Sequence, residues 1–93
     1  MNIEIADVVI PINGRDKGKS FLVIAIENEF SKIADGKGRR LEKPKLKKNK
    51  HLRLEGKNIG QITEKLCSGE KITNKELRKA LAQYAACREK GGM

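Results

Sequence analysis

The sequence predicts a mainly β protein, a small barrel of five short strands followed by a pair of helices. Short β-branched and apolar runs, separated by glycine, proline and asparagine, fill residues 5–55, and apolar residues at helical spacing begin at residue 59. With 93 residues, the chain has room for one small domain or for a minimal domain with an appendage. We therefore divide it into a barrel, residues 1–56, and a helical extension, residues 57–93.

The first two predicted strands flank a loop that contains glycine. The run from Ile5 to Ile12 is β-branched, and Pro11 suits the end of a strand because it has no N–H to donate to a ladder. The run from Ser20 to Glu27 is apolar on both faces, so we expect this strand in the middle of the barrel. One face would carry Phe21, Val23 and Ala25, and the other Leu22, Ile24 and Ile26.

The third and fourth strands are expected on either side of an Asp-Gly turn. The run from Phe30 to Asp35 alternates as a strand, after a two-residue turn at residues 28–29. Because Asp-Gly is a strong hairpin signal, residues 39–43 are expected to return as the fourth strand. Leu41 would face inward, and its two charged neighbours would face outward.

A basic loop and a closing strand complete the predicted barrel. Residues 44–50 lack an apolar period, which predicts an extended loop. Residues 51–55 alternate between polar and apolar side chains, which predicts a fifth strand. Five short strands within roughly 55 residues favour a small SH3-like barrel.

Beyond the barrel, the apolar spacing changes to that of helices. Apolar residues recur at helical spacing from Ile59 to Leu66, and Gly69 follows as a stop signal. Thr73 and Glu76 form a capping box that opens a second helix. We expect an antiparallel helix pair, or two helices lying on the barrel. The apolar stripe of the second helix consists of Leu77, Ala80, Leu81, Tyr84 and Ala85.

Positive charge is concentrated in one segment of the chain. The net charge is +9, and residues 36–57 alone hold ten basic and two acidic side chains. A field concentrated in this way attracts polyanions, above all nucleic acid. The alternative that stays open is a solvated, lysine-rich loop with no partner.

Several classes of function are disfavoured by the sequence. The loop NGRDKGKS differs from a phosphate-binding P-loop, because Gly14 stands one residue too late and a strand follows instead of a helix. Two distant cysteines and one histidine do not make a metal site, and neither a metal nor another cofactor is expected. No credible pair of nucleophile and base is present, so we do not expect an enzyme. Turn or surface positions are expected for Asp7, Asp16 and Asp35.

The sequence also indicates a location. No apolar run approaches the roughly 20 residues that a membrane helix needs. The start, MNIEIADVV, lacks the basic residues of a signal peptide. We therefore expect a cytoplasmic protein that is monomeric when free and has no membrane partner.

Two blocks of the sequence resemble those of known RNA-binding proteins. Residues 7–24, DVVIPINGRDKGKSFLVI, are similar to the KOW motif, which spans two strands and their loop in ribosomal and transcription-factor SH3-like domains. Residues 33–52, IADGKGRRLEKPKLKKNKHL, are similar to the large-subunit ribosomal KOW proteins of archaea and eukaryotes and to their small bacterial relatives. The resemblance covers residues 5–54, with Gly18 at the characteristic glycine of the motif. It implies a module that binds RNA, ribosomal RNA in particular.

The residues themselves support recognition of phosphate groups. Lysine and arginine recur in the first loop, at the Asp-Gly turn and along the basic loop, and we expect the three groups to form one continuous surface. Few aromatic side chains are available to stack on bases, which favours structured RNA gripped along its backbone. The candidate RNA-binding residues are Arg15, Lys17, Gly18, Lys19, Lys37, Arg39, Arg40, Lys43, Lys45, Lys47, Lys48, Lys50 and His51.

Two other functions remain open beside the preferred one, an RNA-binding protein associated with the ribosome or with translation. In the first, a KOW-type protein-interaction module docks a ribosomal or transcription-machinery protein on the apolar stripe of residues 77–85. In the second, residues 58–89 form a helix-turn-helix, with Lys75, Arg78 and Lys79 at the start of a recognition helix. Ribosomal proteins are further candidate partners of the preferred function.

Overall fold

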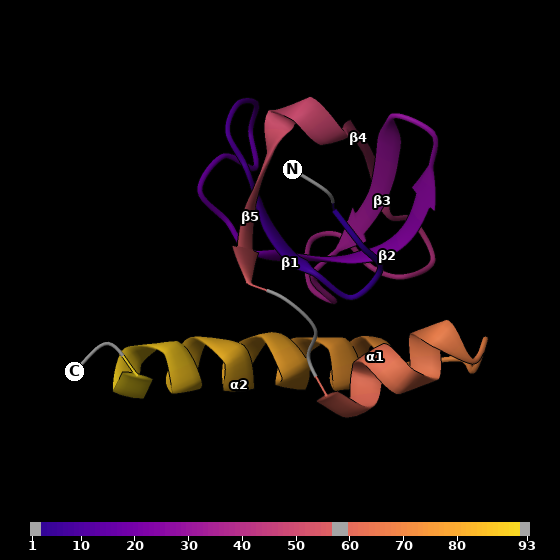
Figure 1. Cartoon of the computed structure of the whole chain (residues 1–93), viewed down its shortest axis with the longest axis vertical. Coiled ribbons are helices and arrows are strands. Elements are labelled where there is room, and N and C mark those ends of the chain that lie inside the picture. Colours follow the sequence, from indigo (N-terminus) through magenta and orange to yellow (C-terminus); the bar gives the residue numbers. More distant parts are fainter. Residues whose placement is uncertain (1–2, 57–59, 92–93) are drawn as a thin grey trace.

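A computed structural model describes residues 3–56 and 60–91, and Figure 1 shows a curled β-sheet with two helices on one side of it. The strands are β1 (Val8–Pro11), β2 (Phe21–Glu27), β3 (Phe30–Ala34), β4 (Lys45–Lys48) and β5 (Leu52–Gly56). A short 3-10 helix, Asn49–His51, joins the last two strands, and the helices are α1 (Gly60–Cys67) and α2 (Asn74–Gly91). The prediction of a mainly β fold followed by helices is confirmed.

The five strands form one antiparallel sheet in the order β4-β3-β2-β1-β5. β2 lies at its centre, as the two apolar faces of this strand predict. β1 pairs with β2 on one side and with β5 on the other, so that Val9 lies between Phe21 and Leu54. Because the sheet curls, one of its faces is enclosed and the other meets the helices (Figure 1).

A β-bulge in β2 changes which side chains share a face. The register with β3 shifts around Ile24, which leaves this residue as the extra one. Ile26 therefore packs with Phe21 and Val23 inside the curled sheet, whereas Leu22 and Ile24 pack toward the helices. The predicted alternation is right as far as Ile24 and wrong for Ile26, because a period of two residues contains no signal for a bulge.

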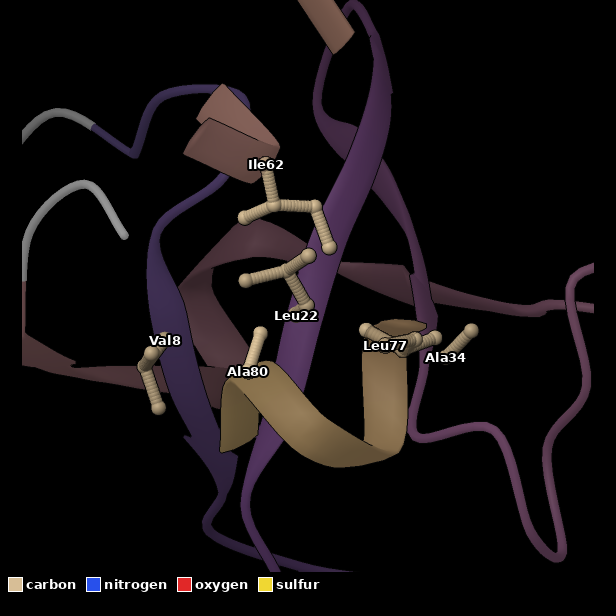
Figure 2. Close-up of a cluster of buried hydrophobic side chains, with 6 residues drawn as sticks. All are labelled: Val8, Leu22, Ala34, Ile62, Leu77 and Ala80. Atoms are coloured by element: carbon tan, nitrogen blue, oxygen red, sulfur yellow. The ribbon is translucent and has the colours of Figure 1, made fainter. Parts of the chain in front are cut away.

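Two clusters of buried apolar side chains form the core. The first lies inside the curled sheet and consists of Val9, Phe21, Val23, Ile33 and Leu52. The second lies between the sheet and the helices, and Figure 2 shows its members, Val8, Leu22, Ala34, Ile62, Leu77 and Ala80. Four of the five residues in the predicted stripe of α2 pack in or against this second cluster, whereas Ala85 is exposed.

Local signals place the end of α1 and the start of α2 correctly. Gly69, with a φ of 81°, follows α1 as the predicted stop. At the start of α2, the Glu76 N–H donates to Thr73 Oγ1 at 3.1 Å, and the Thr73 N–H donates to Glu76 Oε1 at 3.2 Å. The predicted capping box is therefore confirmed. Ile59 and the predicted boundary at residue 57 lie outside the described residues.

The fourth strand lies in a different place from the predicted one. Residues 39–43 contain bends and a turn but no strand, and β4 lies within the segment that was expected to be a loop. Leu41 lies against α2 instead, where its N–H donates to Asn74 Oδ1 at 2.8 Å. β4 pairs with β3 alone, as an edge strand, and an edge rich in lysine discourages pairing with other chains. Such a strand needs no buried face, so its sequence shows no apolar period.

His51 and Asp7 each differ in one respect from what the sequence predicts. His51 belongs to the 3-10 helix and not to the fifth strand, which begins at Leu52. Asp7 lies in a turn, as expected, but its side chain is fully buried and accepts the Glu4 N–H at 2.8 Å. Among the residues that the structure describes, no helix is long and apolar enough to cross a lipid bilayer.

Candidate nucleic-acid interface

Side chains from the three predicted basic groups meet around one surface hollow with a volume of about 230 Å³. Arg15 comes from the loop between β1 and β2, and Arg39 from the turn that follows β3. Lys45 and Lys47 come from β4. Four cations from three separate segments therefore surround the same space, where they can attract an anionic ligand.

Two contacts hold these segments together. Lys47 Nζ donates to the carbonyl oxygen of Asn13 at 3.3 Å, which ties β4 to the first loop. Arg39 Nε donates to Asp16 Oδ2 at 3.2 Å, and Arg39 Nη2 lies 3.2 Å from the same oxygen. The first loop is thereby tied to the turn after β3 as well. Within the first loop, Gly14, Arg15 and Asp16 line the hollow.

Asp35 builds the turn that presents Arg39. Its Oδ1 accepts the N–H groups of Lys37 and Arg39, both at 2.9 Å, and the Arg39 carbonyl oxygen accepts the N–H groups of Asp35 and Gly36. Gly36 has a φ of 81°, a conformation that glycine adopts without steric cost. The Asp-Gly turn is confirmed, although it leads into irregular chain and not into a hairpin.

The alternation of β4 divides its lysines between two faces. Lys45 and Lys47 line the hollow, and the residues between and beyond them face the other way. On that other face, Lys48 Nζ lies 5.8 Å from the centre of the Phe30 ring, within the range of a cation–π contact. Leu46 shares this face and is 51% exposed. The hollow therefore receives two of the lysines of β4 and excludes Lys48.

The remaining candidate residues do not line the hollow. Gly18 has a φ of 84°, and its N–H donates to the Pro11 carbonyl oxygen at 3.2 Å, which fits its expected role of turning the chain. His51 is half-buried in the 3-10 helix. One continuous surface over all three groups stays a prediction. The other members are all exposed, namely Lys17, Lys19, Lys37, Arg40, Lys43 and Lys50.

Sequence reasoning missed two features of this region. Asp16 was expected only as a turn or surface residue, yet it lies in the hollow and binds Arg39. Arg78 of α2, considered only within a helix-turn-helix, donates from Nη1 to the Gly36 carbonyl oxygen at 2.7 Å. The one signal for Asp16 is that an acidic residue stands alone in a strongly basic loop. The partner of Arg78 lies 42 residues away in the chain, and no local pattern indicates it.

Comparison with known proteins assigns no family to the chain. No protein-family model matches the sequence, and no curated protein matches it.

Proposed function

We propose that the protein is an RNA-binding module with an SH3-like barrel of the KOW type, and that it binds structured RNA, ribosomal RNA in particular. The observation that carries this proposal is the convergence of Arg15, Arg39, Lys45 and Lys47 around one hollow. These four cations come from segments far apart in the sequence. A chain that needed charge only for solubility would have no reason to gather them.

The two kinds of cation would have different tasks on RNA. A guanidinium group can donate two parallel hydrogen bonds to one phosphate, so Arg15 and Arg39 would fix the position of the backbone. Lys45 and Lys47 would act as point charges that add affinity with little dependence on sequence. The chain offers few aromatic side chains for stacking, which favours folded RNA over an extended single strand.

The resemblance of two sequence blocks to KOW proteins supports the same function. Residues 7–24 hold Arg15, and residues 33–52 hold Arg39, Lys45 and Lys47. All four cations of the hollow therefore lie in the part of the chain where the resemblance was found. The proposal accordingly places RNA at the hollow and not on the exposed face of the helices.

A salt titration tests the proposal. Binding of a folded ribosomal RNA fragment should weaken steeply with salt, with a log–log slope of roughly 0.7–0.9 for each phosphate contact. Replacing Lys45 and Lys47 by glutamine should lower that slope by about 1.5. The matched control replaces Lys32 and Lys71, which do not line the hollow, and should leave the slope nearly unchanged. A flat salt response would contradict the proposal, and sedimentation with ribosomal particles tests the association with ribosomes.

The two alternative functions have less support. The apolar stripe that would dock a partner protein packs on the protein's own sheet, with Leu77 and Ala80 buried there. The start of α2 lies against the turn after β3, where Arg78 donates to Gly36 and Asn74 donates to Glu42. A recognition helix needs this end free to enter a groove.

A further inference from the structure

One acidic side chain lies among the cations of the hollow. Asp16 has a side chain that is 18% exposed, and both contacts from Arg39 end on its Oδ2 atom. Among the described residues, no hydrogen bond reaches its Oδ1 atom. A carboxylate repels phosphate. The contact that ties Asp16 to Arg39 uses only Oδ2, so Oδ1 is left to accept a hydrogen bond from a ligand.

The rest of the hollow suits a flat group. Pro11 and Ile33 lie beneath it and are almost fully buried, and Arg15 and Arg39 contribute guanidinium groups. Unstacked RNA bases bind to planar guanidinium groups as well as to aromatic rings. The volume of about 230 Å³ equals that of about eight water molecules at ~30 Å³ each, which is room for one base.

We propose that the hollow holds a single unpaired RNA base, and that Asp16 Oδ1 accepts a hydrogen bond from an amino group of this base. The inference rests on the proposed function, since Lys45 and Lys47 would bind the phosphates on either side of the base. Folded RNA presents such bases at bulges and in loops, where proteins read them by hydrogen bonds to their edges. The hollow thus adds base discrimination to a surface that otherwise recognises phosphate.

The chemistry of Asp16 determines which bases fit. An ionised carboxylate only accepts hydrogen bonds, and adenine, cytosine and guanine each carry an exocyclic amino group that donates. Uracil carries carbonyl oxygens instead, and its imino N–H lies between two of them, so a carboxylate is repelled on both sides. The hollow therefore prefers a bulged adenine, cytosine or guanine over a bulged uracil.

Binding of five RNA hairpins tests this preference. Four hairpins differ only in one bulged nucleotide, A, C, G or U, and the fifth is fully paired. At fixed salt, fluorescence anisotropy should give dissociation constants about tenfold lower for the preferred bulge than for uracil, the size expected for one hydrogen bond to a charged group. Equal affinity for all five hairpins overturns the base site.

A change of one atom in Asp16 should invert the preference. In Asp16→Asn, the amide oxygen continues to accept from Arg39, so the amide N–H₂ faces the hollow and donates to a carbonyl group of uracil. The tenfold preference against uracil should disappear or reverse, and affinity for the fully paired hairpin should rise because a negative charge is lost. The matched control, Glu29→Gln, removes the same charge at an exposed position outside the hollow and should keep the preference.

The outcomes separate this inference from the proposed function. An unchanged preference in Asp16→Asn overturns the role of Asp16, and a salt-dependent affinity that ignores the bulge overturns the base site but leaves the phosphate surface standing. Failure to bind any hairpin at low salt overturns the proposed function itself. The hairpin series with the unaltered protein decides the question even where Asp16→Asn is less stable.

Discussion

A single glycine determines how closely the turn after β3 approaches α2. Gly36 has a φ of 81°, and a Cβ atom added there would lie 2.6 Å from the Asn74 carbonyl oxygen and 2.8 Å from Arg78 Cγ. Gly18 has a φ of 84° as well, but an added Cβ atom would have nothing within 4 Å. The two glycines share a backbone conformation and differ in crowding, so they form a matched pair.

We expect Gly36→Ala to lower the free energy of unfolding by about 3 kcal/mol. The left-handed conformation costs about 1–2 kcal/mol for a residue with a side chain, and crowding against α2 adds about 1–3 kcal/mol. Gly18→Ala should show only the cost of the left-handed conformation, because no atom crowds the added Cβ atom. Urea unfolding followed by circular dichroism measures both values, and equal losses in the two variants would show that the turn does not press on α2.

For individual residues, the sequence predicted the role of a residue type better than the partner that the residue contacts. Gly18 and Gly36 stand in turns, as their surroundings predict. The pairing of Asp16 with Arg39 could not be predicted, because these residues lie 23 positions apart and the contact depends on how two loops meet. The same holds for the contact between Arg78 and Gly36.

Among the secondary-structure elements, those with a local signal were predicted correctly. The capping box of α2 and the stop after α1 need only a few neighbouring residues, so the sequence displays them directly. β4 has no such signal, because an edge strand rich in lysine buries no face and its position depends on its pairing with β3. All three lysines of β4 were therefore included in the candidate site, but their division between two faces of the strand was missed.

An ion pair between Lys65 of α1 and Glu76 of α2 should make the stability of the protein depend on pH. The hydrogen bond from Lys65 holds the pKa of the Glu76 carboxyl below its ordinary value of 4.5, and the hydrogen bond to Glu76 raises the pKa of Lys65 above 10.5. Glu76 therefore stabilises the folded protein above pH 4.5, and this contribution is lost as the pH falls through the lowered pKa. The contribution of Lys65 is present below pH 10.5 and is lost as the pH rises through the raised pKa.

We expect Glu76→Gln to remove the acid-side part of this dependence. The urea midpoint of the variant should lie below that of the unaltered protein at about pH 6, and the two should converge as the pH falls through the lowered pKa of Glu76, where the carboxyl binds a proton. Urea unfolding at a series of pH values measures the difference. A difference in urea midpoint that stays constant over the pH series would mean that the ion pair does not contribute to stability.

Over the whole molecule, one apolar cluster joins the sheet to both helices. Val8, Leu22 and Ala34 enter it from the strands, and Ile62, Leu77 and Ala80 enter it from the helices (Figure 2). Tyr84 adds a second connection, since its hydroxyl donates to the Glu55 carbonyl oxygen at 2.8 Å. The sequence left open whether the helices pair with each other or lie on the barrel, because an apolar stripe does not name the surface that it meets.

We expect Leu77→Ala to loosen the sheet and the helices together. Leu77 is fully buried, and truncating a buried leucine costs about 2–5 kcal/mol. Leu46→Ala is the matched control, because Leu46 is 51% exposed and its truncation should cost less than about 1 kcal/mol. Hydrogen exchange of amides in β2 and α2 measures the effect. Loss of protection in α2 alone would show that the sheet stands without its helices.

The pairing of β1 with β5 also determines when the sheet can be completed during synthesis. Val9 pairs with Leu54, 45 residues later, whereas β2 and β3 are joined by a two-residue turn and can pair as soon as both exist. At a synthesis rate of roughly 5–20 residues per second, about 2–9 s pass between the synthesis of Val9 in β1 and that of its partner Leu54 in β5. A nascent chain can therefore form the β2–β3 hairpin early, but it completes the sheet only once β5 has been made.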